Sequence, residues 1–307
     1  MMQSTKLINV LKVLFAVVAW GASFIATKVA LRDVSPLTVV WLRFAMGVLI
    51  IGVAVAARGQ LKLPSWRDAG YFMLLGFLGI AYHQWLQSTG LQTAQASTTA
   101  WIVATTPIFM ALLGVLVLKE RLNLLQVGGI ALATIGVLVV VSGGDLGALG
   151  MDAQGMPGNL YILASAPNWA IFSVLSRRGL REHSPAWMMF YVMGFGWLIS
   201  SIGFFAGPGI AEIPQLTMNG WWGILFLGIA CSGLAYVFWY DALRAIPASQ
   251  VGAYLYLEPL VAVGVAAVIL AEPIFFVSLL GGAAILLGVY LVERPSKTPT
   301  VTETQEI

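Results

Sequence analysis

Residues 31–36 have the sequence Leu-Arg-Asp-Val-Ser-Pro, and residues 180–185 have the sequence Leu-Arg-Glu-His-Ser-Pro. The two hexapeptides are 149 positions apart, and Trp20 and Trp169 match at the same offset. A second set of matches at an offset of 152 pairs Ala96-Ser97 with Ala248-Ser249, Pro107 with Pro259, Glu120 with Glu272, Gly129 with Gly281 and Gly136 with Gly288. The second half of the chain therefore repeats the first.

Apolar runs separate these motifs, each bounded by charged residues or by clusters of Pro and Gly. The runs cover residues 8–31, 36–57, 69–91, 97–118, 125–143, 159–178, 186–206, 221–243, 249–270 and 275–292. A helix needs about 20 apolar residues to cross a bilayer. We therefore predict an all-α integral membrane protein with ten transmembrane helices.

The composition supports this fold class. Of the 307 residues, 59% are apolar and 9% are charged, compared with about 45–50% and about 25% in soluble domains. These values exclude a soluble globular protein and leave no room for a separate aqueous domain. A single cysteine, Cys231, excludes a disulfide within the chain. We expect no cofactor and no metal site, because His, Cys and acidic residues within the spans are too sparse.

The basic residues predict the orientation of the chain. Thirteen of the sixteen Lys and Arg residues fall on the side of the N-terminus, Lys28 and Arg32 fall on the other side, and Arg43 lies within a span. Basic residues collect on the cytoplasmic side of membrane proteins, so we predict that both termini are cytoplasmic. Topology also explains the pI near 9.0, and a nucleic-acid partner is not expected.

Each repeat contains five predicted spans. Because five is an odd number, the two copies are expected to lie upside down relative to one another in the membrane. We place the first five-helix repeat at residues 8–143, the second at residues 158–293 and a polar cytoplasmic tail at residues 294–307. Inverted repeats of this kind are typical of carriers that work by alternating access.

Short motifs at the ends of the spans complete the pattern. They are Thr106-Pro107, Leu118-Lys119-Glu120-Arg121, Gly-Gly-Ile-Ala-Leu-Ala-Thr-Ile-Gly-Val at 128–137, Glu258-Pro259 and Leu270-Ala271-Glu272. In their order and recurrence they resemble the EamA type of the drug/metabolite transporter superfamily over about residues 8–293. The resemblance implies an inner-membrane carrier, usually an exporter of amino acids or related small metabolites, with its substrate cavity between the two halves. The second copy departs from the family pattern at Pro273, which stands in place of an Arg.

The ninth span carries three polar residues on one helical face. Gln250, Tyr254 and Glu258 are four residues apart, and Glu258 is the only acid clearly inside a span. Such a carboxyl is expected to be neutral or paired, and it could couple proton movement to transport or neutralise an ammonium group. A second interpretation is a helix-breaking Glu-Pro element. Pro259 and its repeat mate Pro107 are predicted to act as hinges.

Two other polar residues lie within spans. His83 shares a helical face with Gln87 and could bind a solute or a proton, although a hydrogen-bonded place in a helix interface is the alternative. Arg43 could bind a solute carboxylate. The alternative for Arg43 is that its side chain extends toward the outer membrane surface.

Faces that mix aromatic rings and hydroxyl groups give a further set of candidate cavity residues. The set comprises Trp20, Thr98, Trp101, Trp169, Tyr236 and Trp239. Such faces suit an amphipathic solute, although aromatic stripes also serve packing. Small residues at 129, 133 and 136 and at 281, 284 and 288 allow close helix packing, either within one chain or across a homodimer.

These observations predict a secondary transporter of the inner membrane, not an enzyme. It is expected to export amino acids or related metabolites by alternating access, and proton coupling is one alternative left open. The sequence contains no His-Glu-x-x-His, Gly-x-Ser-x-Gly or phosphate-loop motif. The other functions considered are a translocator of lipid or lipid-linked sugar, an intramembrane enzyme and a passive channel.

Overall fold

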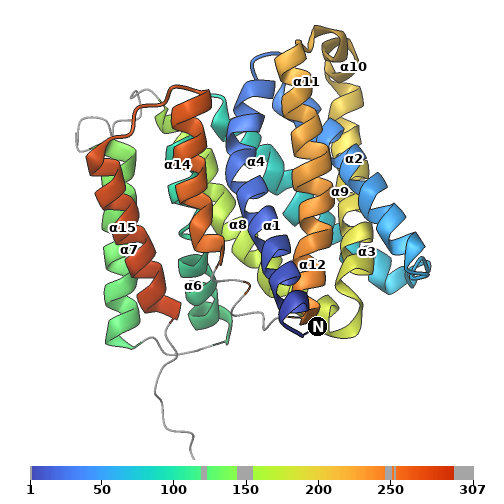
Figure 1. The fold of residues 1–307 in the computed structure, drawn as a ribbon, viewed down its shortest axis with the longest axis horizontal. Coiled ribbons are helices and arrows are strands. Elements are labelled where there is room, and N and C mark those ends of the chain that lie inside the picture. The colour runs from blue at the N-terminus through green and yellow to red at the C-terminus, as the bar shows by residue number, and fades with distance from the viewer. Residues whose placement is uncertain (1, 119–122, 144–154, 246–250, 252–253, 294–307) are drawn as a thin grey trace, which may run out of the picture.

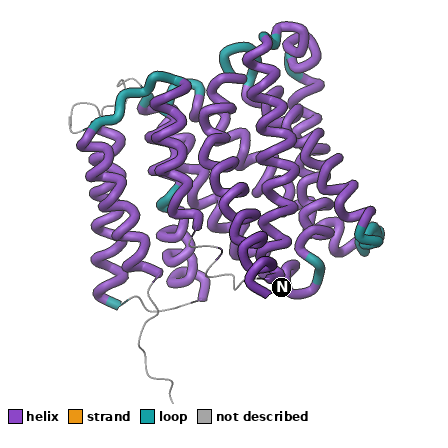
Figure 2. The backbone as a smooth tube through the Cα atoms, in the orientation of Figure 1, coloured by secondary structure: helices purple, strands orange, loops and turns teal. Residues whose placement is uncertain are grey.

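The computed structural model describes residues 2–118, 123–143, 155–245, 251 and 254–293. Every regular element among these residues is helical, as Figure 2 shows. The predicted tail at 294–307 lies outside the described residues.

The first half of the chain forms seven α-helices and one π-helical segment. They are α1 (Met2–Ala30), α2 (Pro36–Ala57), α3 (Trp66–Gly76), η1 (Phe77–Tyr82), α4 (His83–Leu91), α5 (Ala96–Val103), α6 (Thr106–Leu118) and α7 (Leu124–Ser142). The helix ends follow local sequence. Proline starts α2, and Ser65 caps α3 by accepting a hydrogen bond from the Asp68 amide.

The second half has a similar order of elements. They are α8 (Met156–Glu182), α9 (Pro185–Ala206), α10 (Gly209–Glu212), the 3-10 segment η3 (Ile213–Gln215), α11 (Met218–Leu225), the π-helical segment η4 (Phe226–Leu234), α12 (Ala235–Ala245), the 3-10 segment η5 (Tyr254–Leu257), α14 (Glu258–Ile269) and α15 (Phe276–Glu293).

Six helical stretches are long and apolar enough to cross a membrane, and two shorter apolar helices follow at Tyr254–Ile269 and Phe276–Val292. Large apolar side chains on the outside are freely exposed, for example Leu49, Ile202 and Val268 at 69%, 72% and 85%. Such a surface suits contact with lipid. The number of ten crossings and the position of both termini remain predictions.

The two π-helical segments occupy equivalent places in the repeat. Phe77–Ala81 and Phe226–Ala230 have the same five-residue sequence, Phe-Leu-Gly-Ile-Ala, at the offset of 149. A π-helical segment leaves backbone groups without their usual partners, and it occurs often at functional sites. In η1 the Asn168 side chain of α8 donates to the Leu78 carbonyl at 2.8 Å. The repeat thus includes an irregular backbone feature near the middle of two helical stretches.

Two other helical stretches are broken next to the matched prolines. The helix ends at Val103 and restarts at Thr106, directly before Pro107. The 3-10 segment η5 leads into α14, where Pro259 follows Glu258 in the first turn. Proline is well tolerated in the first turn of a helix, so each interruption of the regular α-helix lies where a proline can follow. Their role as hinges remains a prediction.

Helices α7 and α15 lie side by side at one end of the molecule (Figure 1). Their small residues face each other: a Cβ on Gly129 would lie 2.6 Å from the Gly288 carbonyl oxygen, and one on Gly136 would lie 2.6 Å from that of Gly281. The predicted small-residue stripe therefore packs two helices within one chain. The homodimer remains a prediction, and this stripe no longer supports it.

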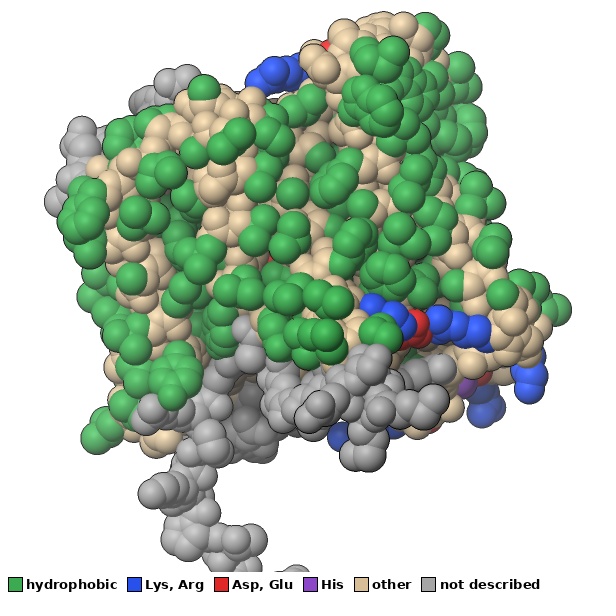
Figure 3. All heavy atoms as spheres, viewed as in Figure 1, with side chains coloured by type: hydrophobic (Ala, Val, Ile, Leu, Met, Phe, Trp, Pro, Cys, Tyr) green, Lys and Arg blue, Asp and Glu red, His purple; other side chains and the backbone are tan. Residues whose placement is uncertain are grey.

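Charged side chains are unevenly distributed over the surface. On the face in Figure 3 they gather in a band near the end where the N-terminus lies, with a smaller basic patch at the opposite end. Hydrophobic and uncharged surface lies between them. This distribution is what a membrane-spanning bundle requires, because charged groups are costly at the depth of the hydrocarbon.

Candidate functional site

Arg43 contacts the irregular segment η4 and the start of α4, which directly follows η1. Its side chain is only 5% exposed, so it points into the helical bundle and not toward a membrane surface. The guanidinium Nε donates to Ser232 Oγ at 3.0 Å, and Nη1 donates to Gln84 Oε1 at 3.0 Å. Ser232 lies within η4, and Gln84 is the second residue after η1. Arg43 has no counterpart in the second half of the chain, where Val192 stands at the equivalent position. It therefore contacts neighbouring, equivalent positions of both halves.

The positive charge of Arg43 has no acidic partner among the described residues. The ion pairs within that part of the chain involve other cations. A guanidinium has five N–H donors, and the two bonds above use neutral acceptors. Removing a charge from water costs several kcal/mol unless an opposite charge compensates it. Arg43 is thus suited to bind an anionic group that enters the bundle.

His83 lies next to this arginine contact, as the first residue of α4. It is 5% exposed, and its ring lies 4.7 Å from that of Trp169, centroid to centroid. Its Nδ1 atom is buried and has no hydrogen-bond partner. His83 and Ser232 are repeat mates at the offset of 149. The two predicted residues His83 and Trp169 are therefore in contact and lie close to Arg43.

Three of the predicted aromatic residues form one cluster. The ring of Trp20 on α1 lies 5.5 Å from that of Tyr236 and 5.1 Å from that of Trp239, both on α12. Trp20 Nε1 also donates to the backbone carbonyl of Cys231 at 3.1 Å, in the residue before Ser232. The aromatic cluster thus contacts η4, the same π-helical segment that accepts a hydrogen bond from Arg43.

Glu258 is the first residue of α14 and is half-buried. Helix α1 approaches α14 closely here, since a Cβ on Gly21 would lie 2.8 Å from the Glu258 carbonyl oxygen. Tyr236 is near enough to both Arg43 and Glu258 to interact electrostatically with each. The acid and the arginine therefore approach the same tyrosine from different helices.

The remaining predicted residues lie apart from this group or outside the described part of the chain. Gln87 is buried on α4, one turn after His83. Tyr254 packs in a small apolar cluster with α1 and α12. Trp101 is buried against α15, where its ring covers Gly282. Thr98 lines a cleft near the helix ends that lie opposite the N-terminus. Gln250 lies outside the described residues.

An ion pair at the same end of the bundle involves two residues that the sequence did not mark as candidates. Glu272 accepts hydrogen bonds from the amides of Ala96 and Ser97 at 2.8 and 3.1 Å and from Ser97 Oγ at 2.7 Å. It thereby caps the first turn of α5. Lys28 Nζ lies 3.9 Å from Glu272 Oε1 and donates to the Ala94 carbonyl. Glu272 therefore caps α5 although Pro273, the departure from the family pattern, follows it directly.

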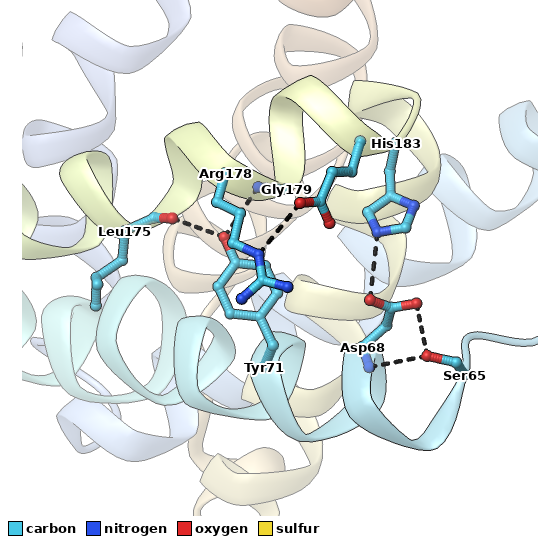
Figure 4. Close-up of polar contacts among 8 residues, drawn as sticks. Ser65, Asp68, Tyr71, Leu175, Arg178, Gly179 and His183 are labelled. Atoms are coloured by element: carbon cyan, nitrogen blue, oxygen red, sulfur yellow. Dashed lines mark hydrogen bonds and ion pairs between the residues drawn. The ribbon is translucent and has the colours of Figure 1, made fainter.

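A second polar network connects the halves at the opposite end, between α3 and α8 (Figure 4). Tyr71 donates its hydroxyl to the Leu175 carbonyl at 2.6 Å and accepts from the Gly179 amide at 3.1 Å. Asp68 lies 3.4 Å from His183 Nε2 and accepts from the Ser65 hydroxyl. Described contacts between the two halves of the chain therefore exist at both ends of the bundle.

Comparison with known proteins identifies the family. The model of the EamA-like transporter family matches residues 7–142 and again residues 156–294. The chain belongs to the EamA-like transporter family. As an EamA-like protein it is a multi-pass membrane protein of the drug/metabolite transporter superfamily, and the relatives below are named as transporters rather than enzymes.

The relatives of this EamA-like chain are similar along nearly their whole length. An uncharacterized transporter of Archaeoglobus fulgidus is 27% identical over 89% of this chain and 92% of its own. Probable amino-acid metabolite efflux pumps of Salmonella typhimurium and Escherichia coli are 28% and 26% identical, each over 91% of this chain and 92% of the other. A crystal structure superposes with a TM-score of 0.63 at 21% identity, covering 95% of this chain and 96% of the other, which shows the fold alone.

Proposed function

We propose that the chain exports amino acids or related small metabolites across the inner membrane by alternating access. The observation that carries this proposal is the buried charge of Arg43, which has only neutral partners among the described residues. The names of two relatives, probable amino-acid metabolite efflux pumps, agree with it. A carboxylate is the common anionic group of such solutes, and Arg binds carboxylates with good geometry.

The other groups near Arg43 suit the rest of an amino-acid solute. Glu258 provides a carboxyl that interacts with an ammonium group, or that takes up and releases a proton in exchange for the solute. The rings of Trp20, Trp169 and Tyr236 supply apolar and cation-binding surface for a side chain. His83 offers an unpartnered nitrogen beside this surface.

The proposed movement follows from the repeat. Ten spans in two inverted halves, residues 8–143 and 158–293, exchange their conformations as the cavity opens to one side and then to the other. Arg43 links α4 to η4, so a bound carboxylate that competes for its donors weakens the contact between the halves. Pro107 and Pro259, each in the first turn of its helix, are proposed to be the hinges of this movement. The termini are proposed to remain cytoplasmic.

The test is uptake of labelled amino acids into liposomes that contain the purified protein, with and without a pH gradient. We expect saturable uptake that responds to the gradient. Glu258→Gln should abolish the response to pH while the protein remains folded, because the amide cannot exchange a proton. His83→Ala separates the contribution of the imidazole, and the exposed variant Arg32→Gln is the control.

Unchanged pH dependence in the folded Glu258→Gln protein would remove Glu258 from proton coupling. Absence of uptake for every amino acid tested, in a preparation that is folded by its melting transition, would contradict the proposed solute class. Flux that does not saturate with concentration would contradict a carrier mechanism.

A further inference from the structure

A polar cleft lies at the helix ends opposite the N-terminus, apart from the group around Arg43. It has a volume of about 470 Å³ and is bounded by α1, α5, α7, α8 and α15. This volume is within the usual range for small-molecule sites, about 300–1,000 Å³. Its lining is mostly polar and includes Lys28, Gln95, Thr98, Asn159 and Ser278.

Lys28 gives the cleft its charge. No carboxylate is among the described residues that line the cleft. The nearby Glu272 is 3.9 Å from Lys28 Nζ, longer than a hydrogen bond, and its oxygens already accept three bonds from the start of α5. An ammonium group has three N–H donors. Lys28 gives one to the Ala94 carbonyl, so it retains a donor for an anion in the cleft.

Asn159 supplies a second group that points to a ligand. It lies in the first turn of α8 and is 9% exposed. Its Oδ1 atom is buried and accepts no hydrogen bond. A buried acceptor without a partner is costly, about 1–3 kcal/mol, and a bound N–H or O–H group removes that cost.

We infer that this cleft is an outer binding site for a small solute that carries a carboxylate next to an N–H or O–H donor. Lys28 binds the carboxylate, and Asn159 Oδ1 accepts from the donor. Amino acids and hydroxy acids have this chemistry. The inference deepens the proposed function and rests on it for the direction of transport. In that transport the cleft is a second binding site, on the outer side of the membrane and separate from the site at Arg43.

The near absence of cysteine allows a direct test. Cys231 is fully buried, and a Cys231→Ser background removes it. Ser278→Cys then places one thiol in the cleft wall, and Gln215→Cys places one on the exposed surface of the α10–α11 connection. In lipid nanodiscs both are labelled with an anionic thiosulfonate reagent, which carries a sulfonate, and with a cationic reagent, which carries a quaternary ammonium group.

We expect the ratio of anionic to cationic labelling rate to be about tenfold higher at Ser278→Cys than at Gln215→Cys, because the Lys28 ammonium lines the cleft whereas the carboxylate of its ion-pair partner Glu272 does not. Lys28→Gln should remove this excess, whereas the exposed neighbour Arg32→Gln should leave it in place. L-threonine should slow labelling in the cleft, and L-threonine amide, which lacks the carboxylate, should not. Asn159→Ala should weaken the protection by threonine without changing the ratio.

Equal ratios at the two thiols, or an excess that survives Lys28→Gln, would overturn the site, as would equal protection by threonine and its amide. The melting transition of each variant reports whether it is folded. Failure of amino-acid uptake with the labelling results intact would contradict the proposed function alone. Uptake without the labelling difference would contradict the cleft alone.

Discussion

Arg43→Gln tests the carboxylate site most directly, because it removes the charge and keeps a polar side chain. Two hydrogen bonds from the guanidinium, each of 3.0 Å, contribute about 1.5–3 kcal/mol each. Burial of the ion costs several kcal/mol in the opposite direction. Because these contributions nearly cancel in the solute-free protein, the free energy of unfolding should change by less than about 2 kcal/mol.

The effect on solute recognition should be much larger. A solute carboxylate that accepts two charge-assisted hydrogen bonds from Arg43 gains at least about 3 kcal/mol. Since each 1.4 kcal/mol corresponds to about a factor of ten, Arg43→Gln should raise the half-saturation concentration for uptake about 100-fold. Arg43→Lys keeps the charge but loses the planar pair of donors, and it should give an intermediate value.

The assay is initial uptake rate against solute concentration in proteoliposomes, together with the melting temperature of each variant. Arg32→Gln, which removes an exposed arginine, should leave both quantities unchanged. A folded Arg43→Gln protein with a half-saturation concentration within about threefold of the wild type would refute the assignment of Arg43 to the carboxylate.

Two further predictions concern stability. Gly129→Ala should lower the free energy of unfolding by about 1–3 kcal/mol, because its Cβ would lie 2.6 Å from a carbonyl oxygen of α15. Gly128 faces open space, so Gly128→Ala should not lower the free energy of unfolding. Thermal unfolding of the two variants checks this difference. Burial alone would raise the pKa of Glu212, but hydrogen bonds from Thr38 and Ser35 outweigh it and lower the pKa below 4.5. This stabilisation is present above pH 4.5 and is lost as the pH falls. Glu212→Gln should therefore melt below the wild type at neutral pH, and the two melting temperatures should converge as the pH is lowered below 4.5.

The sequence predicted the fold class because lipid imposes a simple rule. A spanning helix must be apolar for about 20 residues, and such runs are visible without knowledge of packing. The π-helical segments were not predicted. The signal that could have found them is the repeated Phe-Leu-Gly-Ile-Ala at Phe77–Ala81 and Phe226–Ala230, whose exact recurrence marks an equivalent backbone feature in both halves.

The candidate site was predicted in part. His83, Trp169, Trp20 and Tyr236 were selected as polar or aromatic residues within spans, and the structure places them near Arg43 or near one another. Trp101 is packed against α15 instead. A helical face alone cannot distinguish these outcomes, because the face toward a cavity and the face toward another helix have similar compositions.

The partners of a buried charge are the least predictable feature of this chain. Arg43 contacts residues 41 and 189 positions away, and Lys28 approaches Glu272 from the other half of the chain. The repeat does not predict these partners, because the position equivalent to Arg43 is Val192 and the equivalent positions His83 and Ser232 differ in chemistry. The repeat therefore supplies two equivalent backbones, and the proposed function depends on the residues in which the two halves differ. The proposed carrier requires this asymmetry, since under the proposal one solute with one carboxylate is held between two halves of similar fold.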